Sequence, residues 1–355
     1  MADQDLSKQL QQQILQARSD KSKLEIQGGN SKHFYGRQHR PDAQVLAVAA
    51  HSGVVNYQPA ELVLTARSGT PLTEIRELLA ANHQIMPFDP PAFADTATLG
   101  GTMACGLSGP ARPFSGAARD HVLGLRVLNG LGQHLRFGGE VMKNVAGYDA
   151  SRLMIGAFGT LGVLTEASIK VLPAPATQRT IIHQMTESEA LTFIDKLRTR
   201  YLPVTGWCYA EGRSFTRLAG SALNVAAVAK ELGGEVLSRA EQRWVELREH
   251  TLPFFDDPRP LWRLSLPPGT APLALSGRQL LDWAGCQRWL LSDADAPLIQ
   301  NTCRDLGGHA ELFRNTGKSD NFQHLDKALI PLQQRIKASF DPDGLFNPGR
   351  VSAHW

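Results

Sequence analysis

The sequence predicts an α+β protein with two domains. Its 355 residues are more than one ordinary hydrophobic core accommodates. Strand-like and helix-like hydrophobic patterns alternate along most of the chain. A proline-rich stretch, Leu172-Pro173-Ala174-Pro175-Ala176, reads as a linker between a glycine-dense first half and a second half of regularly alternating elements. We therefore expect one domain over residues 1–174 and another that begins at 175.

The first half is predicted to open with a helix and two strands. Four apolar residues share one face of the first helix: Leu6, Leu10, Ile14 and Leu15. Strands are predicted at 24–26 and 61–65. Thr70-Pro71 is predicted to start the next helix, because proline suits the first helical position. That helix has an apolar face of Leu72, Ile75, Leu78 and Leu79.

The second half is predicted to alternate between strands and helices. A capping box of Thr186 and Glu189 begins a helix, and Gly233-Gly234 ends another that spans 222–232. Further strands are predicted at 180–182, 207–210, 215–218, 261–266 and 286–291, and one strand of the first half is predicted at 163–171. Further helices are predicted at 296–306 and 325–339, and an irregular tail follows.

Composition and charge exclude several classes of protein. The net charge is +3 and no run of basic residues occurs, so we expect no nucleic-acid partner. No apolar stretch approaches the roughly 18 residues of a membrane span, and the N-terminus lacks the features of a signal peptide. We therefore expect a cytoplasmic protein. The four cysteines form no CxxC pair, which predicts reduced thiols and neither an iron–sulfur nor a zinc site.

Two glycine-rich segments are candidate phosphate loops. Residues 98–162 contain 14 of the 32 glycines. Gly28-Gly29-Asn30-Ser31-Lys32 and Thr98-Leu99-Gly100-Gly101-Thr102 each offer backbone N–H groups with no bulky side chains, and the first adds a lysine. Such backbone binds phosphate groups well. Tight turns in a loop-rich β domain would give the same composition, and composition alone does not separate the two interpretations.

Other nucleotide and catalytic motifs are absent from the sequence. Gly156, Gly159 and Gly162 follow a predicted helix and precede a strand, the reverse of a dinucleotide fingerprint. Gly317-Lys318-Ser319 resembles the end of a P-loop, but the position of its first glycine is Leu312. Neither HExxH nor GxSxG occurs. We therefore expect no metal site, and the sequence identifies no catalytic base.

Six segments in a fixed order resemble the FAD-binding domain of the vanillyl-alcohol oxidase/p-cresol methylhydroxylase (PCMH-type) flavoprotein family. Together they span about half of the chain. They are Gly28-Gly29-Asn30-Ser31, Pro87-Phe88-Asp89-Pro90 with 98–104, Arg119-Asp120-His121-Val122-Leu123-Gly124, 143–149, 159–166 and 340–350. Within this family, the run KNVAGYDASRLMIGAFGTLGVLTEASIKVLP and the short chain are similar to the FAD-binding subunits of glycolate-oxidising complexes.

The resemblance implies a fold and a cofactor. The fold would be a PCMH-type FAD-binding domain of two α+β subdomains, about 20–95 and 96–174. A smaller ferredoxin-like α/β cap would follow over 175–324, and a helix and tail over 325–355 would return to the FAD domain. The cofactor-binding residues carried over are Gly28, Gly29, Asn30, Ser31, Lys32, Pro87, Asp89, Thr98, Leu99, Gly100, Gly101, Thr102, Ala104, Cys105, Gly106, Asp120, Gly159, Gly162, Val163 and Asn347. Lys143, Asn144 and Tyr148 stay open between cofactor contact and a structural role.

Two departures from the family narrow the expected function. Some relatives attach the flavin through a histidine directly after the first Gly-Gly, where this chain has Asn30, so the FAD is expected to be non-covalent. Catalytic relatives also carry a histidine-rich cluster in the C-terminal half, of which only Gly307-Gly308-His309-Ala310-Glu311 is seen. The resemblance therefore implies a subunit that relays electrons while glycolate is oxidised to glyoxylate. Its partners would be a sister FAD-containing catalytic subunit and an iron–sulfur subunit, through which the complex could contact the plasma membrane.

Three alternatives remain open at the level of sequence. The chain could be a self-sufficient 2-hydroxyacid dehydrogenase, which needs an arginine for the substrate carboxylate and a base for the hydroxyl proton. Arg263, His309 and Glu311 have the right residue types for those roles. The chain could instead be a structural subunit without a working flavin, or a family member that acts on a sugar or another alcohol.

Overall fold

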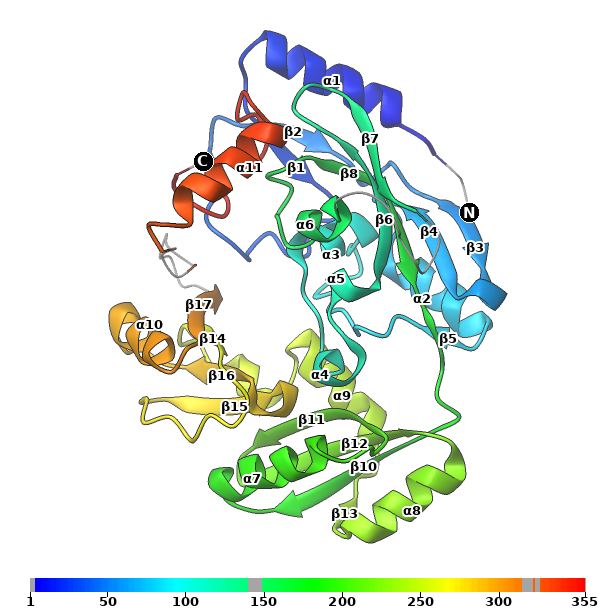
Figure 1. Cartoon of the computed structure of the whole chain (residues 1–355), viewed down its shortest axis with the longest axis vertical. Helices are drawn as coiled ribbons and strands as arrows, with labels where there is room; N and C mark the ends of the chain where they lie inside the picture. Colours follow the sequence, from blue (N-terminus) through cyan, green and yellow to red (C-terminus); the bar gives the residue numbers. More distant parts are fainter. Residues whose placement is uncertain (1–3, 140–148, 315–321, 323–325, 355) are drawn as a thin grey trace. The chain divides into compact units, whose positions relative to one another are not determined.

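The protein is α+β, as the sequence predicts. A computed structural model of the chain describes residues 4–139, 149–314, 322 and 326–354 (Figure 1). Its contacts group into two compact units. Unit 1 comprises 1–107, 117–174 and 324–355, and unit 2 comprises 108–116 and 175–323. The boundary at Ala174/Pro175 lies in the proline-rich stretch. Residues 108–116 group with unit 2, although the sequence assigns them to the first domain.

The first layer of unit 1 is a small parallel sheet covered by a helix. Strands β1 (Leu24–Gln27) and β2 (Gln44–Ala47) pair in parallel, and α1 (Ser7–Ser19) packs on them through Leu10, Ile14 and Ala17. Leu15, predicted on the same face, is 45% exposed. Its position one residue past Ile14 turns it about 100° around the helix, away from the apolar stripe. Leu6 precedes the helix as its N-cap.

The second layer of unit 1 is an antiparallel sheet. Its strand order is β3 (Val54–Gln58), β4 (Val63–Arg67), β8 (Val163–Lys170), β6 (Val122–Leu128), β7 (His134–Gly138). The remaining elements of the unit up to residue 174 are η1 (Pro59–Glu61), α2 (Leu72–Ala81), β5 (Gln84–Ile85), α3 (Leu99–Cys105), α5 (Ala118–His121), α6 (Ala150–Met154) and β9 (Leu172–Pro173). The predicted strand at 61–65 begins two residues later, because Leu62 adopts φ +57° and closes η1 first.

Unit 2 is built on one antiparallel sheet of eight strands. Its strand order is β13 (Glu235–Val236), β10 (Thr177–Gln184), β12 (Arg213–Gly220), β11 (Val204–Ala210), β15 (Arg278–Asp282), β16 (Gln287–Leu291), β14 (Leu261–Ser265), β17 (His309–Arg314). The first four strands, with α7 (Glu187–Arg198) and α8 (Ala222–Leu232), form the βαββαβ pattern of a ferredoxin-like fold. The other four extend the sheet beyond that expectation.

Three helices of unit 2 lie where the sequence predicts them, and a fourth, α9 (Ala240–Glu249), was not predicted. The Thr186/Glu189 capping box opens α7, and α7 and α8 pack their buried residues into one core with Trp207 and Leu218. In the second half of the sheet, α10 (Ala296–Asp305) packs Ile299 and Cys303 into a second core. The other helical elements are α4 (Arg112–Ser115), α9 (Ala240–Glu249), η2 (Pro253–Asp256) and η3 (Trp283–Gly285).

The tail of the chain packs beside the N-terminal strand of unit 1 (Figure 1). Helix α11 (Ile330–Phe340) begins later than the predicted 325, because Pro331 is tolerated only in a first helical turn. The Leu24 N–H donates to Leu345 O at 2.8 Å, and Leu345 and Phe346 are buried among the residues of α1, β1 and β2. Across the described ranges, none of the helices combines the length and hydropathy that crossing a bilayer requires.

Candidate functional site

Two neighbouring cavities in unit 1 gather most of the predicted loop residues. The first is lined by Glu25, Ile26, Gly28, Gly29, Asn30, Ser31, Lys32, His33, His39, Thr98, Gly101, Ala104, Cys105, Phe158, Asn347 and Arg350. The second is lined by Ile26, Gly28, Val48, Ser68, Gly100, Gly101, Ala104, Phe158, Gly159, Gly162, Leu164 and Asn347. Because the two share several lining residues, they form adjoining parts of one site, which lies between β1, α3 and the turn after α6.

The loop after β1 presents four backbone donors to this site. Across the described residues, the N–H groups of Gly28, Gly29, Asn30 and Ser31 have no hydrogen-bond acceptor within the protein. The left-handed Asn30, at φ +55°, turns the chain within the loop. Unsatisfied consecutive N–H groups of this kind form an anion-binding nest. The chemistry of the loop therefore fits a phosphate or diphosphate group.

The second glycine loop plays a different part from the first. The N–H groups of Leu99 and Gly100 donate to Thr70 O at 2.9 Å and Ser68 O at 2.7 Å, and the Gly101 N–H donates to the N-cap hydroxyl of Thr98 at 3.2 Å. The donors that the sequence suggested for a second phosphate contact are thus bonded inside the protein. This loop anchors the start of α3 and forms the wall of the site.

The two loops are in direct contact with each other. Thr96 Oγ1 donates to Gly29 O at 2.6 Å, and a Cβ atom on Gly29 would lie 1.4 Å from Thr96 O. A Cβ atom on Gly28 would lie 2.8 Å from Thr98 Oγ1. Only glycine permits this approach, so the Gly-Gly pair is needed for packing between the loops as well as for an open backbone.

Two buried cations complete the wall of the first cavity. Lys32 is 6% exposed, and its Nζ lies 3.3 Å from both Ser31 Oγ and Ala92 O. Arg350 is 5% exposed and donates to the carbonyl oxygens of Arg37, His33 (2.8 Å) and Tyr35 (2.5 Å). Burial lowers the pKa of the Arg350 guanidinium from its usual value. Arg350, which was not predicted from the sequence, therefore fixes the backbone of residues 33–37 beside the first cavity.

Asn347 ties three segments together at the junction of the two cavities. Its Oδ1 accepts from Ile26 N at 2.9 Å, and its Nδ2 donates to Phe158 O at 2.6 Å. Its own N–H donates to Leu24 O at 2.9 Å. Phe158 N–H in turn donates to Ala104 O at 2.8 Å, which joins the turn after α6 to α3. The predicted Asn347 therefore lines the site and fixes its geometry from the tail.

The second cavity contains a buried hydroxyl that the sequence analysis did not find. Ser68 is 1% exposed and lines this cavity beside Gly100. Its Oγ has no hydrogen-bond partner among the residues that the structure describes. A buried hydroxyl without a partner costs about 1–3 kcal/mol, so a ligand group in the cavity would remove a penalty that the protein alone leaves in place.

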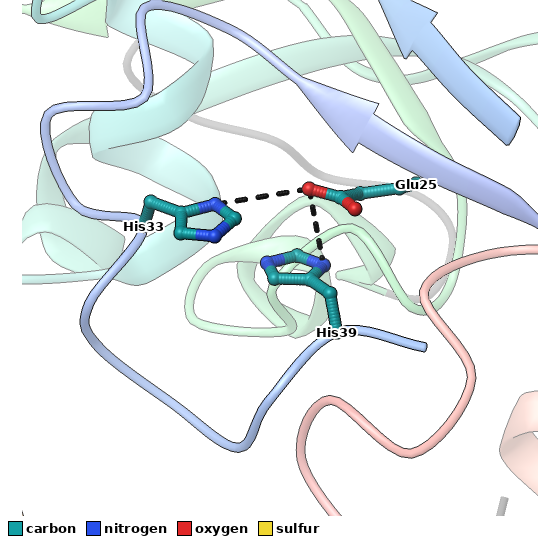
Figure 2. A group of neighbouring side chains, drawn as sticks. All are labelled: Glu25, His33 and His39. Atoms are coloured by element: carbon teal, nitrogen blue, oxygen red, sulfur yellow. Dashed lines mark ion pairs between the residues drawn. The ribbon is translucent and has the colours of Figure 1, made fainter. Parts of the chain in front are cut away.

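One group of side chains in the first cavity was not expected from the sequence. Glu25 is 8% exposed, and its Oε1 lies 3.7 Å from His33 Nδ1 and 3.4 Å from His39 Nδ1 (Figure 2). The two imidazole rings stack with centroids 4.6 Å apart. Burial, followed by Arg350 and His33, lowers the pKa of His39 to about 3. Glu25, His33 and His39 form no recognised spacing motif, and they meet only because β1 and the loop at 28–39 fold together.

Seven predicted residues do not line either cavity: Pro87, Asp89, Leu99, Thr102, Gly106, Asp120 and Val163. Leu99 and Val163 are fully buried core residues, and Gly106 ends α3 in the left-handed conformation. Asp120 accepts the N–H of Ala117 at 2.8 Å and so caps α5. Lys143, Asn144 and Tyr148 lie outside the described residues.

The candidate catalytic residues of unit 2 meet on neighbouring strands. The pairing of β14 with β17 places Arg263 opposite Glu311 and Ser265 opposite His309. Arg263 donates to Glu311 Oε1 at 2.8 Å and to Gln287 Oε1 at 2.7 Å. Its guanidinium also lies 5.0 Å from the centre of the Trp283 ring. The guanidinium is thus bonded to protein acceptors, which is the usual state of a structural arginine and not that of an open carboxylate receptor.

Comparison with known proteins places this site in a family. The FAD binding domain family matches residues 7–138. The chain is 48% identical to the glycolate oxidase subunit GlcE of Escherichia coli strain K12 over 349 residues, which covers 98% of each chain. The chain belongs to the GlcE family. The PCMH-type resemblance and the FAD cofactor expected from the motifs are thereby confirmed.

Other relatives of this GlcE-family chain are less similar to it. The glycolate oxidase subunit GlcD of Bacillus subtilis strain 168 is 32% identical over 146 residues, which are 41% of this chain and 31% of that protein. A D-lactate dehydrogenase of Anaerostipes hadrus is 30% identical over 138 residues, 39% of this chain and 29% of that protein. The solved structure of an alkyldihydroxyacetonephosphate synthase superposes with a TM-score of 0.64 at 14% identity, and covers 96% of this chain and 75% of the synthase. That likeness shows the fold alone.

Proposed function

We propose that this chain is the FAD-binding subunit of a glycolate-oxidising complex, in which it holds FAD without a covalent bond and relays electrons. The four unsatisfied N–H groups of the loop at 28–31 carry the cofactor part of the proposal, because they offer a ready site for a diphosphate. The likeness to GlcE along the whole length supports the assignment to such a complex. A sister flavin subunit that oxidises the substrate and an iron–sulfur subunit are the proposed partners.

The residues around the two cavities fit the proposed cofactor. The first loop would meet the diphosphate, Lys32 and Arg350 would offset its charge, and Ser68 would donate to a polar group in the second cavity. FAD supplies the redox chemistry, so the protein has to bind, orient and shield it. Asn30, which stands where a histidine tether would be needed, donates through Nδ2 to Gln27 Oε1 at 3.2 Å and forms no bond to a flavin.

The contacts and exposure of the candidate catalytic residues support the relay role. A dehydrogenase that binds a 2-hydroxyacid needs a cation for the substrate carboxylate, and Arg263 already pairs with Glu311. A substrate carboxylate that bound Arg263 would have to displace Glu311 from this pair. His309 is exposed at the edge of the sheet. These contacts favour a subunit that receives electrons from a partner over one that oxidises glycolate itself.

The relay proposal predicts that the purified chain keeps its flavin oxidised when glycolate is added without oxygen. Adding the sister flavin subunit should bring about reduction, which is followed by absorbance of the flavin bands. The exposed His309→Ala variant should behave as the unmodified chain does in both assays. Reduction of the isolated chain as fast as in the complex, and its loss in His309→Ala, would instead show a self-sufficient dehydrogenase.

A further inference from the structure

Glu25, His33 and His39 have the chemistry of a metal-binding group. The three side chains line the first cavity, and one ligand atom from each lies within 4.8 Å of the others. They come from β1 and from the loop that follows it, as Figure 2 shows. Two imidazole nitrogens with one carboxylate oxygen is a ligand set that suits zinc and related transition metals.

The distances in this group match a tetrahedral site better than they match hydrogen bonds. The Glu25 Oε1 atom lies 3.4 Å from His39 Nδ1 and 3.7 Å from His33 Nδ1. A hydrogen bond from a ring nitrogen to an oxygen would measure about 2.7–3.2 Å. In a tetrahedral zinc site with bonds of about 2.1 Å, neighbouring ligand atoms are about 3.4 Å apart. The distances from Glu25 Oε1 to the two histidine nitrogens are therefore close to those between neighbouring ligand atoms of a tetrahedral zinc site.

The surroundings orient the carboxylate and leave room for a further ligand. Gln27 Nε2 donates to Glu25 Oε1 at 2.7 Å, which is the kind of outer contact that fixes a metal ligand. The His33 side chain is 53% exposed, so its ring can turn toward the ion. The side chains of His39 and Glu25 are 15% and 10% exposed, so their positions are fixed by packing. Because all three residues face a cavity, water can supply the fourth ligand.

We propose that Glu25, His33 and His39 form a binding site for Zn²⁺ or a related divalent transition metal in the wall of the cofactor cavity. Lys32 and Arg350 line the same cavity and repel a dication. Only an ion that binds imidazole nitrogen strongly can offset this repulsion, so the site should select such ions. It should reject Mg²⁺ and Ca²⁺, which require more oxygen ligands than the single carboxylate provides. This inference goes beyond the proposed function, since it depends on neither glycolate nor a partner subunit.

The test is metal binding by the purified flavoprotein, stripped with a chelator and titrated with Zn²⁺, Co²⁺ and Mg²⁺. We expect one Zn²⁺ per chain by elemental analysis, a visible Co²⁺ spectrum typical of tetrahedral coordination that Zn²⁺ abolishes, and no Mg²⁺ binding. His33→Ala and Glu25→Gln should each weaken Zn²⁺ binding by at least about tenfold, the effect of losing even an outer contact. Far-ultraviolet circular dichroism, measured on the same samples, reports whether a variant still folds.

A matched control separates this site from ordinary surface histidines. His354 is exposed and its side chain makes no bond among the described residues, so His354→Ala should bind Zn²⁺ as the unmodified protein does. Because the side chain of His33 is half-exposed, His33→Ala is expected to fold. Failure of the unmodified protein to bind Zn²⁺ would overturn the proposal. Equal binding by His33→Ala, Glu25→Gln and the unmodified protein would overturn it as well.

Discussion

Gly29→Ala is expected to remove most of the FAD from the purified protein. The new Cβ atom would lie 1.4 Å from Thr96 O and 2.5 Å from Thr96 C, so one of the two loops has to move. Both contacts are to backbone, which cannot turn aside as a flexible side chain can. Forced overpacking typically costs about 1–3 kcal/mol, and if that cost falls on the FAD-binding conformation, affinity drops roughly 5–150-fold. The ratio of flavin to protein absorbance after purification measures the effect.

Gly212→Ala provides the control for this prediction. Gly212 lies in the turn between β11 and β12 of unit 2, where a Cβ atom meets nothing within 4 Å, but its φ of +74° makes alanine strained. The substitution therefore costs about 1–2 kcal/mol of conformational strain without disturbing either loop. We expect the Gly212→Ala protein to retain its FAD. Equal FAD content in the two variants would show that the close approach of Gly29 to Thr96 is unimportant for the cofactor site.

Asp341→Ala is expected to produce a large loss of stability in unit 1. Asp341 is 1% exposed and accepts from Lys337 Nζ at 2.6 Å, Leu345 N at 2.9 Å and Phe346 N at 2.8 Å. Lys337 also donates to Thr160 O at 2.6 Å, which links the tail to the turn after α6. Removing one partner of a buried ion pair costs about 3–5 kcal/mol. Because the same tail carries Asn347 and Arg350, FAD should be released at a lower temperature.

The neighbouring Asp343 gives a matched control in the same tail. It pairs with Arg18 at 2.7 Å, but the two side chains are 45% and 43% exposed. Exposed pairs contribute about 0–1 kcal/mol, so Asp343→Ala should leave the temperature of FAD release nearly unchanged. Flavin fluorescence during heating measures both variants. If Asp343→Ala lowered the release temperature as much as Asp341→Ala, the account of the buried pair would be wrong.

The sequence predicted several strongly periodic elements of the fold well, but strands β2, β3, β7, β15 and β17 and helix α9 were not predicted. Helices α7, α8 and α10 and strand β8 lie within a residue or two of their predicted bounds, because their apolar spacing and caps are strong local signals. Two elements begin later than predicted because single residues have special backbone conformations. The left-handed Leu62 delays β4, and Pro331 delays α11. Of the four added strands of the unit 2 sheet, β14 and β16 were predicted at 261–266 and 286–291. Strands β15 and β17 were missed, and they pair with the distant β11 and β14, which hydrophobic periodicity does not encode.

The cofactor site was predictable where its chemistry is contiguous in the sequence. The Gly-Gly loop at 28–32 does line the site, since consecutive residues remain neighbours in any fold. The residues that were missed come together only through long-range packing. Arg350 reaches His33, and Ser68 lies beside Gly100. Glu25, His33 and His39 likewise carry no sequence signal, because their grouping depends on the path of one loop.

The central claim, a flavoprotein that holds FAD without a covalent bond, is tested most directly by denaturing the purified yellow chain and analysing the supernatant. The account predicts close to one unmodified FAD per chain in solution and a colourless precipitate. A flavin that stays with the precipitate would show a covalent bond that Asn30 cannot provide. A protein that is colourless from the start and cannot be reconstituted with FAD would contradict the account as a whole.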